Sequence, residues 1–396
     1  MTKGSLNSGK KVYLVHGKRT PFGKFGGSLK DITPVDLAVH SAKAAMREAG
    51  IKPEMFDHVV LGNVAPSTTD TIYGGRHVAL KLGMPEHTPG YTVNRLCGSG
   101  IQAILDAVRL IKLGEAEVVL SGGAENMSMM PHLVYGGRFG VKYGPLQTVD
   151  MLLDTLTDKF TGIPMALTAE KLAQTHGISR EECDIYSVRS HEKAALAYQE
   201  NLLQGEIASV ELKRGVCDKD EHLRFEADLT GMGKLKASFQ KEGVVTPGTA
   251  SGVVDGACSV IVASEEAVNN HGLSPIAEIV DGHVVGVDPK IMGIGPVPAI
   301  QILLEKNNLS LDKIDSFEIN EAFAAQVMAC AQDLKIDEEK LNRWGGAVAV
   351  GHPLAATGAR ISLTLARQLA NYKLGYGIAS ACIGGGQGIS LLLKRV

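Results

Sequence analysis

Two cysteines stand beside glycines, which leave backbone N–H groups open to a bound molecule because glycine has no side chain. Cys97 lies in the segment Leu-Cys-Gly-Ser-Gly at 96–100, and Cys382 lies in Cys-Ile-Gly-Gly-Gly at 382–386. A histidine in a similar setting, His352, lies between them in Gly-His-Pro at 351–353. Two thiols and an imidazole indicate sulfur chemistry on an acyl group.

Cys97 precedes a helix predicted over 101–111. Unpaired N–H groups at a helix N-terminus carry partial positive charge and favour a thiolate, and they can also hold an acyl oxygen. An imidazole nearby would help to form the nucleophile, since a free thiol has a pKa of about 8.5. The alternatives are that Cys97 is a packed core thiol, Cys382 a buried strand residue and His352 a solvated loop histidine.

Asn320 and Glu321 follow a predicted strand, in the segment Asn-Glu-Ala-Phe-Ala at 320–324. The asparagine side chain is suited to orient a water or to donate to an oxyanion, and Glu321 is suited to fix a neighbour. A plain strand-terminal cap is the alternative for Asn320. Gly384-Gly385-Gly386 is no phosphate loop, because no lysine follows at Walker spacing.

The composition is that of a globular protein with two or three domains. The chain has 396 residues, 44% hydrophobic and 21% charged, enough for more than one core. A formal net charge of −3 provides no general attraction to nucleic acid or to anionic membranes. An anionic ligand therefore requires a local basic patch.

The chain shows no targeting, membrane or disulfide pattern. No apolar run reaches the roughly 18 residues that span a bilayer, and Met1-Thr2-Lys3-Gly4-Ser5 lacks an apolar signal core. The six cysteines are scattered, which argues against a disulfide framework and against a zinc site. We expect a cytoplasmic protein without a metal, although a presequence already removed would leave no trace.

Short β-branched runs alternate with amphipathic helical stretches, which predicts an α/β fold. We expect strands at 12–15, 58–61, 118–120, 260–263, 316–319, 347–350, 378–381 and 389–393. A second helix follows His352, with Ile361, Leu365 and Leu369 on one face.

The chain has the pattern of a diverged duplication with an insertion. Segments 50–61 and 308–319 both read as a turn, a short amphipathic step and a strand, and strand, reactive residue and helix recur around Cys97 and His352. Two such halves would bring these loops to a common seam. Between them, residues 121–248 are richer in glycine, methionine and charge, and are partly helical, which indicates an inserted lid rather than a linker.

Together these segments resemble the thiolase family over essentially the whole chain, from Gly-Lys-Arg-Thr-Pro-Phe-Gly at 17–23 to Cys-Ile-Gly-Gly-Gly-Gln-Gly at 382–388. The resemblance implies two similar α/β halves, layered α-β-α-β-α, with an inserted lid domain. The halves would comprise residues 1–120 plus 249–273 and residues 274–396, and the lid residues 121–248 would bind coenzyme A.

The resemblance also implies roles for the matching residues. Cys97 would carry the acyl group, and His352 would take its proton. With a water held by Asn320, His352 would also form an oxyanion hole for the thioester enolate. Cys382 would exchange a proton with the α-carbon, and the backbone N–H groups of Cys97 and Gly384 would hold a second oxyanion.

Coenzyme A would be a substrate, with no further cofactor. By resemblance, Arg224 would meet its nucleotide end and Ser251 its pantetheine arm, while Met165, Ala322 and Phe323 would line the acyl pocket. The alternatives are a solvated arginine and plain core residues.

The implied reaction converts 3-ketoacyl-CoA and CoA into acyl-CoA and acetyl-CoA through a Cys97 acyl-enzyme. Pro164, where acetoacetyl-CoA enzymes commonly have histidine, favours broader chain-length use; the alternative is an acetoacetyl-CoA-specific acetyl-CoA acetyltransferase. A ketoacyl synthase is disfavoured by Cys382, and a non-catalytic acyl-CoA-binding protein by retention of both thiols. The resemblance suggests a homotetramer, a dimer of dimers with a contact at 126–140, and leaves the direction of the reaction open.

One segment departs from the family pattern. The glycine-rich stretch after the histidine usually reads Gly-His-Pro-x-Gly-x-Ser-Gly, whereas this chain has Ala355 and Thr357. Alanine removes access to positive φ, so we expect a slightly different turn. Threonine keeps the hydroxyl, so capping can survive.

Overall fold

The structure is a computed structural model that describes residues 9–396. The predicted first half begins at residue 1, so its first eight residues, including the terminus at 1–5, lie outside the described residues. No helix of the described residues is long and apolar enough to cross a membrane.

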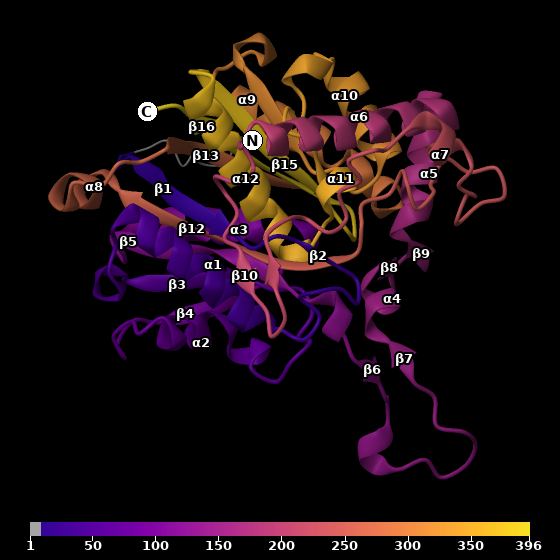
Figure 1. Ribbon diagram of the computed structural model, residues 1–396, viewed down its shortest axis with the longest axis horizontal. Coiled ribbons are helices and arrows are strands. Elements are labelled where there is room, and N and C mark those ends of the chain that lie inside the picture. The colour runs from indigo at the N-terminus through magenta and orange to yellow at the C-terminus, as the bar shows by residue number, and fades with distance from the viewer. Residues whose placement is uncertain (1–8) are drawn as a thin grey trace.

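A ten-stranded sheet runs through the molecule (Figure 1). Its order is β14-β15-β16-β13-β1-β12-β5-β3-β4, with β2 paired to β12. The strands are β1 (Val12–Arg19), β2 (Gly23–Lys24), β3 (His58–Gly62), β4 (Gly90–Val93), β5 (Val118–Glu125), β12 (Val254–Ser264), β13 (Ala277–Gly286), β14 (Ser316–Ile319), β15 (Tyr376–Ile383) and β16 (Gln387–Lys394).

The sheet consists of two similar halves. In one, β3 runs parallel to β5, which pairs antiparallel with β12, which pairs antiparallel with β1. In the other, β14, β15, β16 and β13 repeat that pattern. The halves join where β1 and β13 pair over a short stretch. Each of the predicted repeat segments holds a 3-10 turn and then a strand, Pro53–Met55 with β3 and Leu311–Lys313 with β14.

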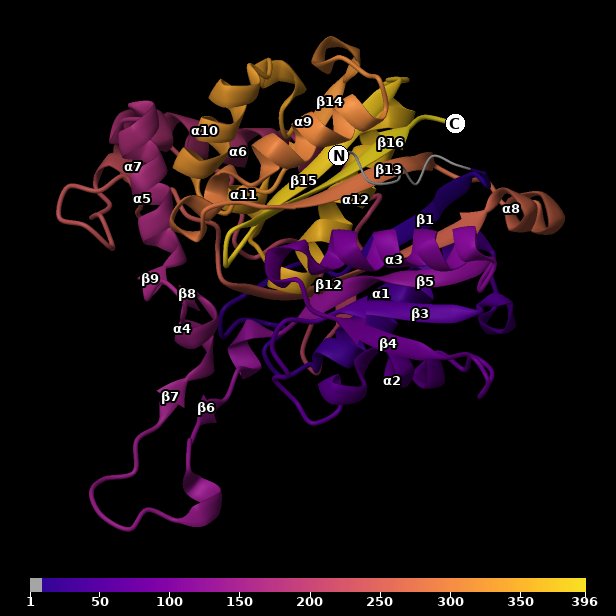
Figure 2. The same ribbon diagram turned by 180° about the vertical axis from the view of Figure 1, so that it is seen from behind.

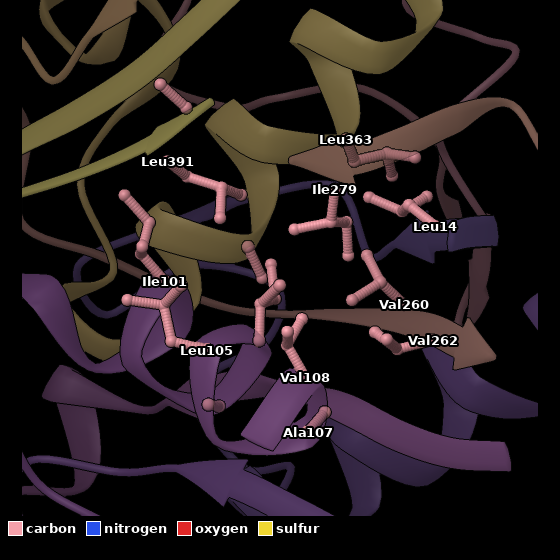
Figure 3. Packing of buried hydrophobic residues seen from close by; sticks show 14 of the residues in the cluster. Leu14, Ile101, Leu105, Ala107, Val108, Val260, Val262, Ile279, Leu363 and Leu391 are labelled. Carbon is pink, nitrogen blue, oxygen red and sulfur yellow. The ribbon is translucent and has the colours of Figure 1, made fainter. Parts of the chain in front are cut away.

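The helices form three layers, one between the two halves of the sheet and one on each outer face. The helices α3 (Ser99–Leu113) and α12 (Leu354–Asn371) lie between them, and their apolar faces share one core with β1, β12, β13, β15 and β16 (Figure 3). Helices α1 (Pro34–Ala49) and α2 (Gly74–Lys81) cover one outer face, and α9 (Pro296–Lys306) and α10 (Ala324–Leu334) cover the other. The arrangement is the layered α-β-α-β-α fold.

The predicted insertion at 121–248 holds the helices α4 (Met151–Thr155), α5 (Met165–His176), α6 (Arg180–Gln199) and α7 (Leu229–Gly233). Short strand pairs connect them, β6 (His132–Leu133) with β7 (Val149–Asp150), β8 (Thr157–Asp158) with β9 (Ile163–Pro164), and β10 (Val210–Glu211) with β11 (Val216–Cys217). The β6–β7 hairpin projects from the body (Figures 1 and 2). Strand β5 continues to Glu125, past the predicted start of the insertion.

One predicted strand is wrong. Residues 347–350 form the short helix α11 (Ala347–Val350), so His352 follows a helix and not a strand. The four apolar residues between glycines fit either structure by pattern alone. Beyond the site-bearing layers, α8 (Glu265–His271) connects β12 to β13.

Candidate active site

Cys97 lies in a 3-10 turn, Leu96–Gly98, directly before α3. The preceding Leu96 has a φ of 45°, a conformation that a leucine adopts only when its surroundings hold it. The Ser99 hydroxyl closes the turn by accepting from the Arg95 N–H at 2.8 Å and donating to the Leu96 carbonyl at 2.7 Å. A side chain at Gly98 would come within 2.6 Å of Ile383, so this turn lies directly against β15.

His352 is buried and its ring is fixed at both nitrogens. Its backbone N–H donates to the Gly252 carbonyl at 3.0 Å. The Thr357 hydroxyl donates to the Pro353 carbonyl at 3.0 Å and lies 2.6 Å from Nδ1 of His352. With the hydroxyl proton given to Pro353, we assign the tautomer in which Nδ1–H donates to the hydroxyl oxygen and Nε2 carries the lone pair. The Asn320 amide nitrogen lies 3.3 Å from this Nε2.

Glu321, beside Asn320, fixes its neighbours as expected. Its buried carboxylate accepts from the hydroxyls of Tyr186 at 2.8 Å and Ser190 at 2.7 Å, both on α6. It also accepts from the Asn342 amide at 2.9 Å and the Val348 N–H at 3.0 Å. The carboxylate thus connects the insertion to the helix that precedes His352.

Cys382 is fully buried near the end of β15. It packs with Met292 and Ala322, and with the partly exposed side chains of Met165 and Phe323. These side chains, apart from Cys382 itself, also line the cavity at Cys97. Cys382 therefore lies directly behind the wall of that cavity.

The cavity at Cys97 brings together most of the residues singled out in the sequence. Its lining is almost wholly apolar and comprises Leu96, Cys97, Thr155, Leu156, Met165, Ser251, Met292, Ala322, Phe323, His352, Leu354 and Gly384. A second cavity of about 280 Å³ shares Ser251, Phe323 and His352 and extends toward Leu153 and Phe239 of the insertion. Arg224 is exposed and lines neither cavity.

Burial keeps the reactive groups neutral. It raises the pKa of Cys97 to about 11, against hydrogen bonds from the N–H groups of Gly384 and Cys97 that lower it. Burial, helped by the positive charge of Arg360, lowers the pKa of His352 to about 3. The pKa of Cys382 lies well above its usual value, chiefly because of burial and also because Cys97 is near. Burial therefore outweighs the expected effect of the helix terminus, which favours a thiolate, and the raised pKa leaves the Cys97 proton for His352 to take.

The altered segment after His352 forms a regular helix start. Ala355 lies in the first turn of α12 and is not among the described residues with positive φ, so no special turn is needed there. The threonine hydroxyl at 357 makes both bonds described above. Among residues 9–396, no group of three or more histidine, cysteine or acidic side chains could hold a metal ion.

Some lining and supporting residues were missed in the sequence, including Leu156, Met292, Glu125 and Phe239. The first two and the last are ordinary apolar residues with no local signal. Glu125 ends a buried strand, and a charge in that place was the available hint.

Two models of known protein families match the sequence of this chain. The model of the thiolase N-terminal domain matches residues 12–266, and that of the thiolase C-terminal domain matches residues 273–395. The chain belongs to the thiolase family. The match covers both halves and the insertion, and every residue placed in the candidate site lies within it.

Similar thiolases agree along nearly the full length. The bovine mitochondrial 3-ketoacyl-CoA thiolase is 48% identical over 389 residues, covering 97% of this chain and 98% of that protein. The crystal structure of human mitochondrial 3-ketoacyl-CoA thiolase in complex with CoA has a TM-score of 0.97 and 46% identity, covering 100% of both chains. The Bacillus anthracis acetyl-CoA acetyltransferase structure has a TM-score of 0.95 and 41% identity, covering 98% of this chain and 100% of that one.

Proposed function

We propose that this thiolase cleaves 3-ketoacyl-CoA with CoA, giving acetyl-CoA and a shortened acyl-CoA, with Cys97 as the acyl carrier. The protein is an enzyme, an acyl-CoA C-acyltransferase. The observation that carries the proposal is the apolar cavity that joins the Cys97 thiol, the neutral His352 imidazole and the Gly384 main chain.

In the first step, Nε2 of His352 takes the Cys97 proton while the sulfur attacks the 3-keto carbon. The oxygen of this carbon gains negative charge, which the N–H groups of Cys97 and Gly384 stabilise. The bond between C2 and C3 then breaks, and the acyl group stays on Cys97. The electron pair moves onto the departing acetyl thioester, whose enolate oxygen faces His352 and a water held by Asn320.

The Cys382 thiol supplies the proton that the departing α-carbon needs, which completes acetyl-CoA. In the second half-reaction the Cys382 thiolate takes the proton of an incoming CoA thiol. The CoA sulfur then attacks the acyl group on Cys97 and breaks its bond to the Cys97 sulfur, so that acyl-CoA leaves. The Cys97 thiolate released in this step takes back its proton from His352, which restores both groups. A thiol whose pKa is raised by burial is suited to this role, because it stays protonated until the carbanion forms.

Substrates with acyl chains longer than acetyl are favoured by the apolar lining, by Pro164 beside Met165, and by the 3-ketoacyl-CoA thiolase relatives. The acetoacetyl-CoA-specific reaction is the second candidate, since a similar structure is an acetyl-CoA acetyltransferase. Thiolysis rates with 3-ketoacyl-CoAs of increasing chain length separate the two. Activity confined to acetoacetyl-CoA would favour the second.

We propose that coenzyme A binds as a substrate in the second cavity. Ser251 would contact its pantetheine arm and Arg224 its nucleotide end. A homotetramer is proposed from the β6–β7 hairpin, which exposes Tyr135, Phe139 and Tyr143. Sedimentation of the wild-type protein and of a variant with alanine at these three aromatic positions compares their oligomeric states and tests the assembly. Cellular location stays a prediction.

Substitution of the two thiols tests the division of roles. In Cys97→Ala we expect no labelled acyl-enzyme from acetyl-CoA, because no sulfur remains to carry the group, while circular dichroism stays unchanged. In Cys382→Ser we expect turnover to fall by at least ~10²-fold and acylation of Cys97 to fall less, since loss of a general acid costs about 10²–10⁴-fold. Label transfer to Cys97→Ala, or equal losses of both rates in Cys382→Ser, would contradict the assignment.

A further inference from the structure

Glu125 is a buried carboxylate beside the cavity that the mechanism above does not use. It ends β5, its exposure is 0%, and no ion pair among the described residues includes it. A buried carboxylate without a cation persists only where several hydrogen-bond donors satisfy it. The groups that donate to the Glu125 carboxylate must therefore stabilise it.

Both oxygens accept hydrogen bonds from two segments that are far apart in the chain. Oε1 accepts from the Asn63 amide and the Ala65 N–H, both at 3.1 Å. Oε2 accepts from the Val64 N–H at 3.1 Å and from the Ala355 N–H at 3.3 Å. Three donors lie at the end of β3 in the first half, and the fourth lies in α12 of the second half.

On the first side, the hydrogen bonds continue to the nucleophile. The Val64 carbonyl accepts from the Asn94 amide at 2.9 Å, and the Asn94 side-chain oxygen accepts from the Leu96 N–H at 2.9 Å. Leu96 has the positive φ noted above and directly precedes Cys97. A strained residue stays in place only when its surroundings hold it, so these bonds bear on the position of the thiol.

On the second side, Glu125 caps the helix that follows the base. Ala355 lies in the first turn of α12, three residues after His352. The N-cap of that helix, Pro353, makes no side-chain hydrogen bond to it. The Glu125 carboxylate takes this place from the other half of the fold, and a negative group there also suits the helix dipole.

We propose that Glu125 is a positioning residue that sets the distance between the Cys97 thiol and the His352 imidazole, by holding the end of β3 and the first turn of α12 at once. The proposal rests on the proposed function for its effect on turnover. Its effect on the Cys97 thiol itself is independent of any substrate.

Glu125→Gln tests this without changing the size of the side chain. An amide has one accepting oxygen, so in either orientation its NH₂ faces the Ala65 N–H or the Val64 N–H, and the end of β3 loses support. We expect the single-turnover rate of Cys97 acylation from acetyl-CoA to fall ~10–100-fold, the effect of a displacement near 1 Å, with KM for CoA nearly unchanged.

Glu206→Gln is the matched control, because it also removes a fully buried, hydrogen-bonded carboxylate that lines neither cavity. Glu206→Gln should acylate Cys97 at the wild-type rate, although its melting temperature should fall as much as that of Glu125→Gln or more.

Alkylation of Cys97 by iodoacetamide at pH 8 separates positioning from charge. The Glu125 charge raises the pKa of Cys97, so its loss alone would speed alkylation. We expect slower alkylation in Glu125→Gln, because the His352 imidazole would no longer lie at the distance from which it accepts the Cys97 proton. Faster or unchanged alkylation would overturn the proposal.

Asn94→Asp provides a second route should Glu125→Gln fail to fold. It keeps the oxygen that faces Leu96 and removes the donor to Val64, at an exposed position. We expect slower alkylation here too. Where Glu125→Gln folds, the combined effect of the two substitutions should be smaller than the sum, since both act on one path. Wild-type alkylation in Asn94→Asp, or strict additivity, contradicts the proposal. A wild-type protein that is alkylated but never acylated would refute the proposed function and leave this comparison intact.

Discussion

At the scale of single residues, the His352 tautomer depends on one hydroxyl. Thr357→Val keeps the shape of the side chain but leaves the buried Nδ1–H without an acceptor. We expect kcat for thiolysis to fall ~10–100-fold, as is typical when a partner that orients a reactive histidine is lost. The free energy of unfolding should fall by ~1–3 kcal/mol for the unsatisfied group. Steady-state kinetics and urea unfolding measure the two effects.

Thr357→Ser is the control for this change. Serine keeps the hydroxyl and is the residue that the family usually has at this position, so activity should return to near the wild-type value. A serine variant as slow as the valine variant would show that the methyl group, and not the hydroxyl, matters.

At the same scale, the sequence was informative where a local pattern existed. Glycine neighbours pointed to Cys97, Cys382 and His352. The structure places Cys97 and His352 on one cavity and Cys382 behind its wall. The effect of burial, which raises the pKa of Cys97, could not be predicted in this way, because burial depends on distant parts of the chain. Glu125 was missed for the same reason, since its donors come from two separate segments.

At the scale of elements, α3 and α12 touch backbone to backbone, and this contact sets the distance between the loops that bear Cys97 and His352. A side-chain carbon at Gly100 would lie 2.4 Å from the Ala359 nitrogen and 2.8 Å from the Ala355 carbonyl oxygen. Gly100→Ala should therefore lower the free energy of unfolding by ~1–3 kcal/mol or more, because backbone atoms cannot yield as side chains do. Denaturant unfolding measures this loss, and activity should fall with it.

Gly233→Ala is the control for the helix contact. A side-chain carbon at Gly233 meets nothing within 4 Å, so this change should leave both stability and turnover unaffected. Equal effects of the two substitutions would mean that backbone freedom, and not close packing, explains the loss at Gly100.

Element types were predicted well where the hydrophobic period was long enough to read. The helix at 101–111 lies within α3, and the strands at 58–61 and 378–381 lie within β3 and β15. The run at 347–350 failed because four apolar residues contain about one helical turn, too few to distinguish the two periods. The strand order joining the halves depends on long-range pairing, which no local pattern contains.

At the scale of the whole molecule, a buried ion cluster joins the insertion to both halves. Arg19, on β1, donates from Nε to Glu206 at 2.6 Å and from both terminal nitrogens to Asp220 at 2.6 and 2.9 Å. Glu206 in turn accepts from the Thr364 hydroxyl of α12 at 2.9 Å, and Asp220 accepts from Tyr198 of α6 at 2.9 Å. The insertion is therefore expected to unfold together with the two halves.

Arg19→Met should lower the free energy of unfolding by ~3–5 kcal/mol, because it leaves two carboxylates buried without a cation. Denaturant unfolding, followed both by circular dichroism and by limited proteolysis of the insertion, should show one shared transition at lower denaturant. Replacing Lys10, which pairs with Glu117 at the exposed surface, should barely move that transition. An Arg19→Met protein that loses the insertion to protease while the rest keeps its wild-type midpoint would contradict the shared transition. The insertion would then be a separate folding unit.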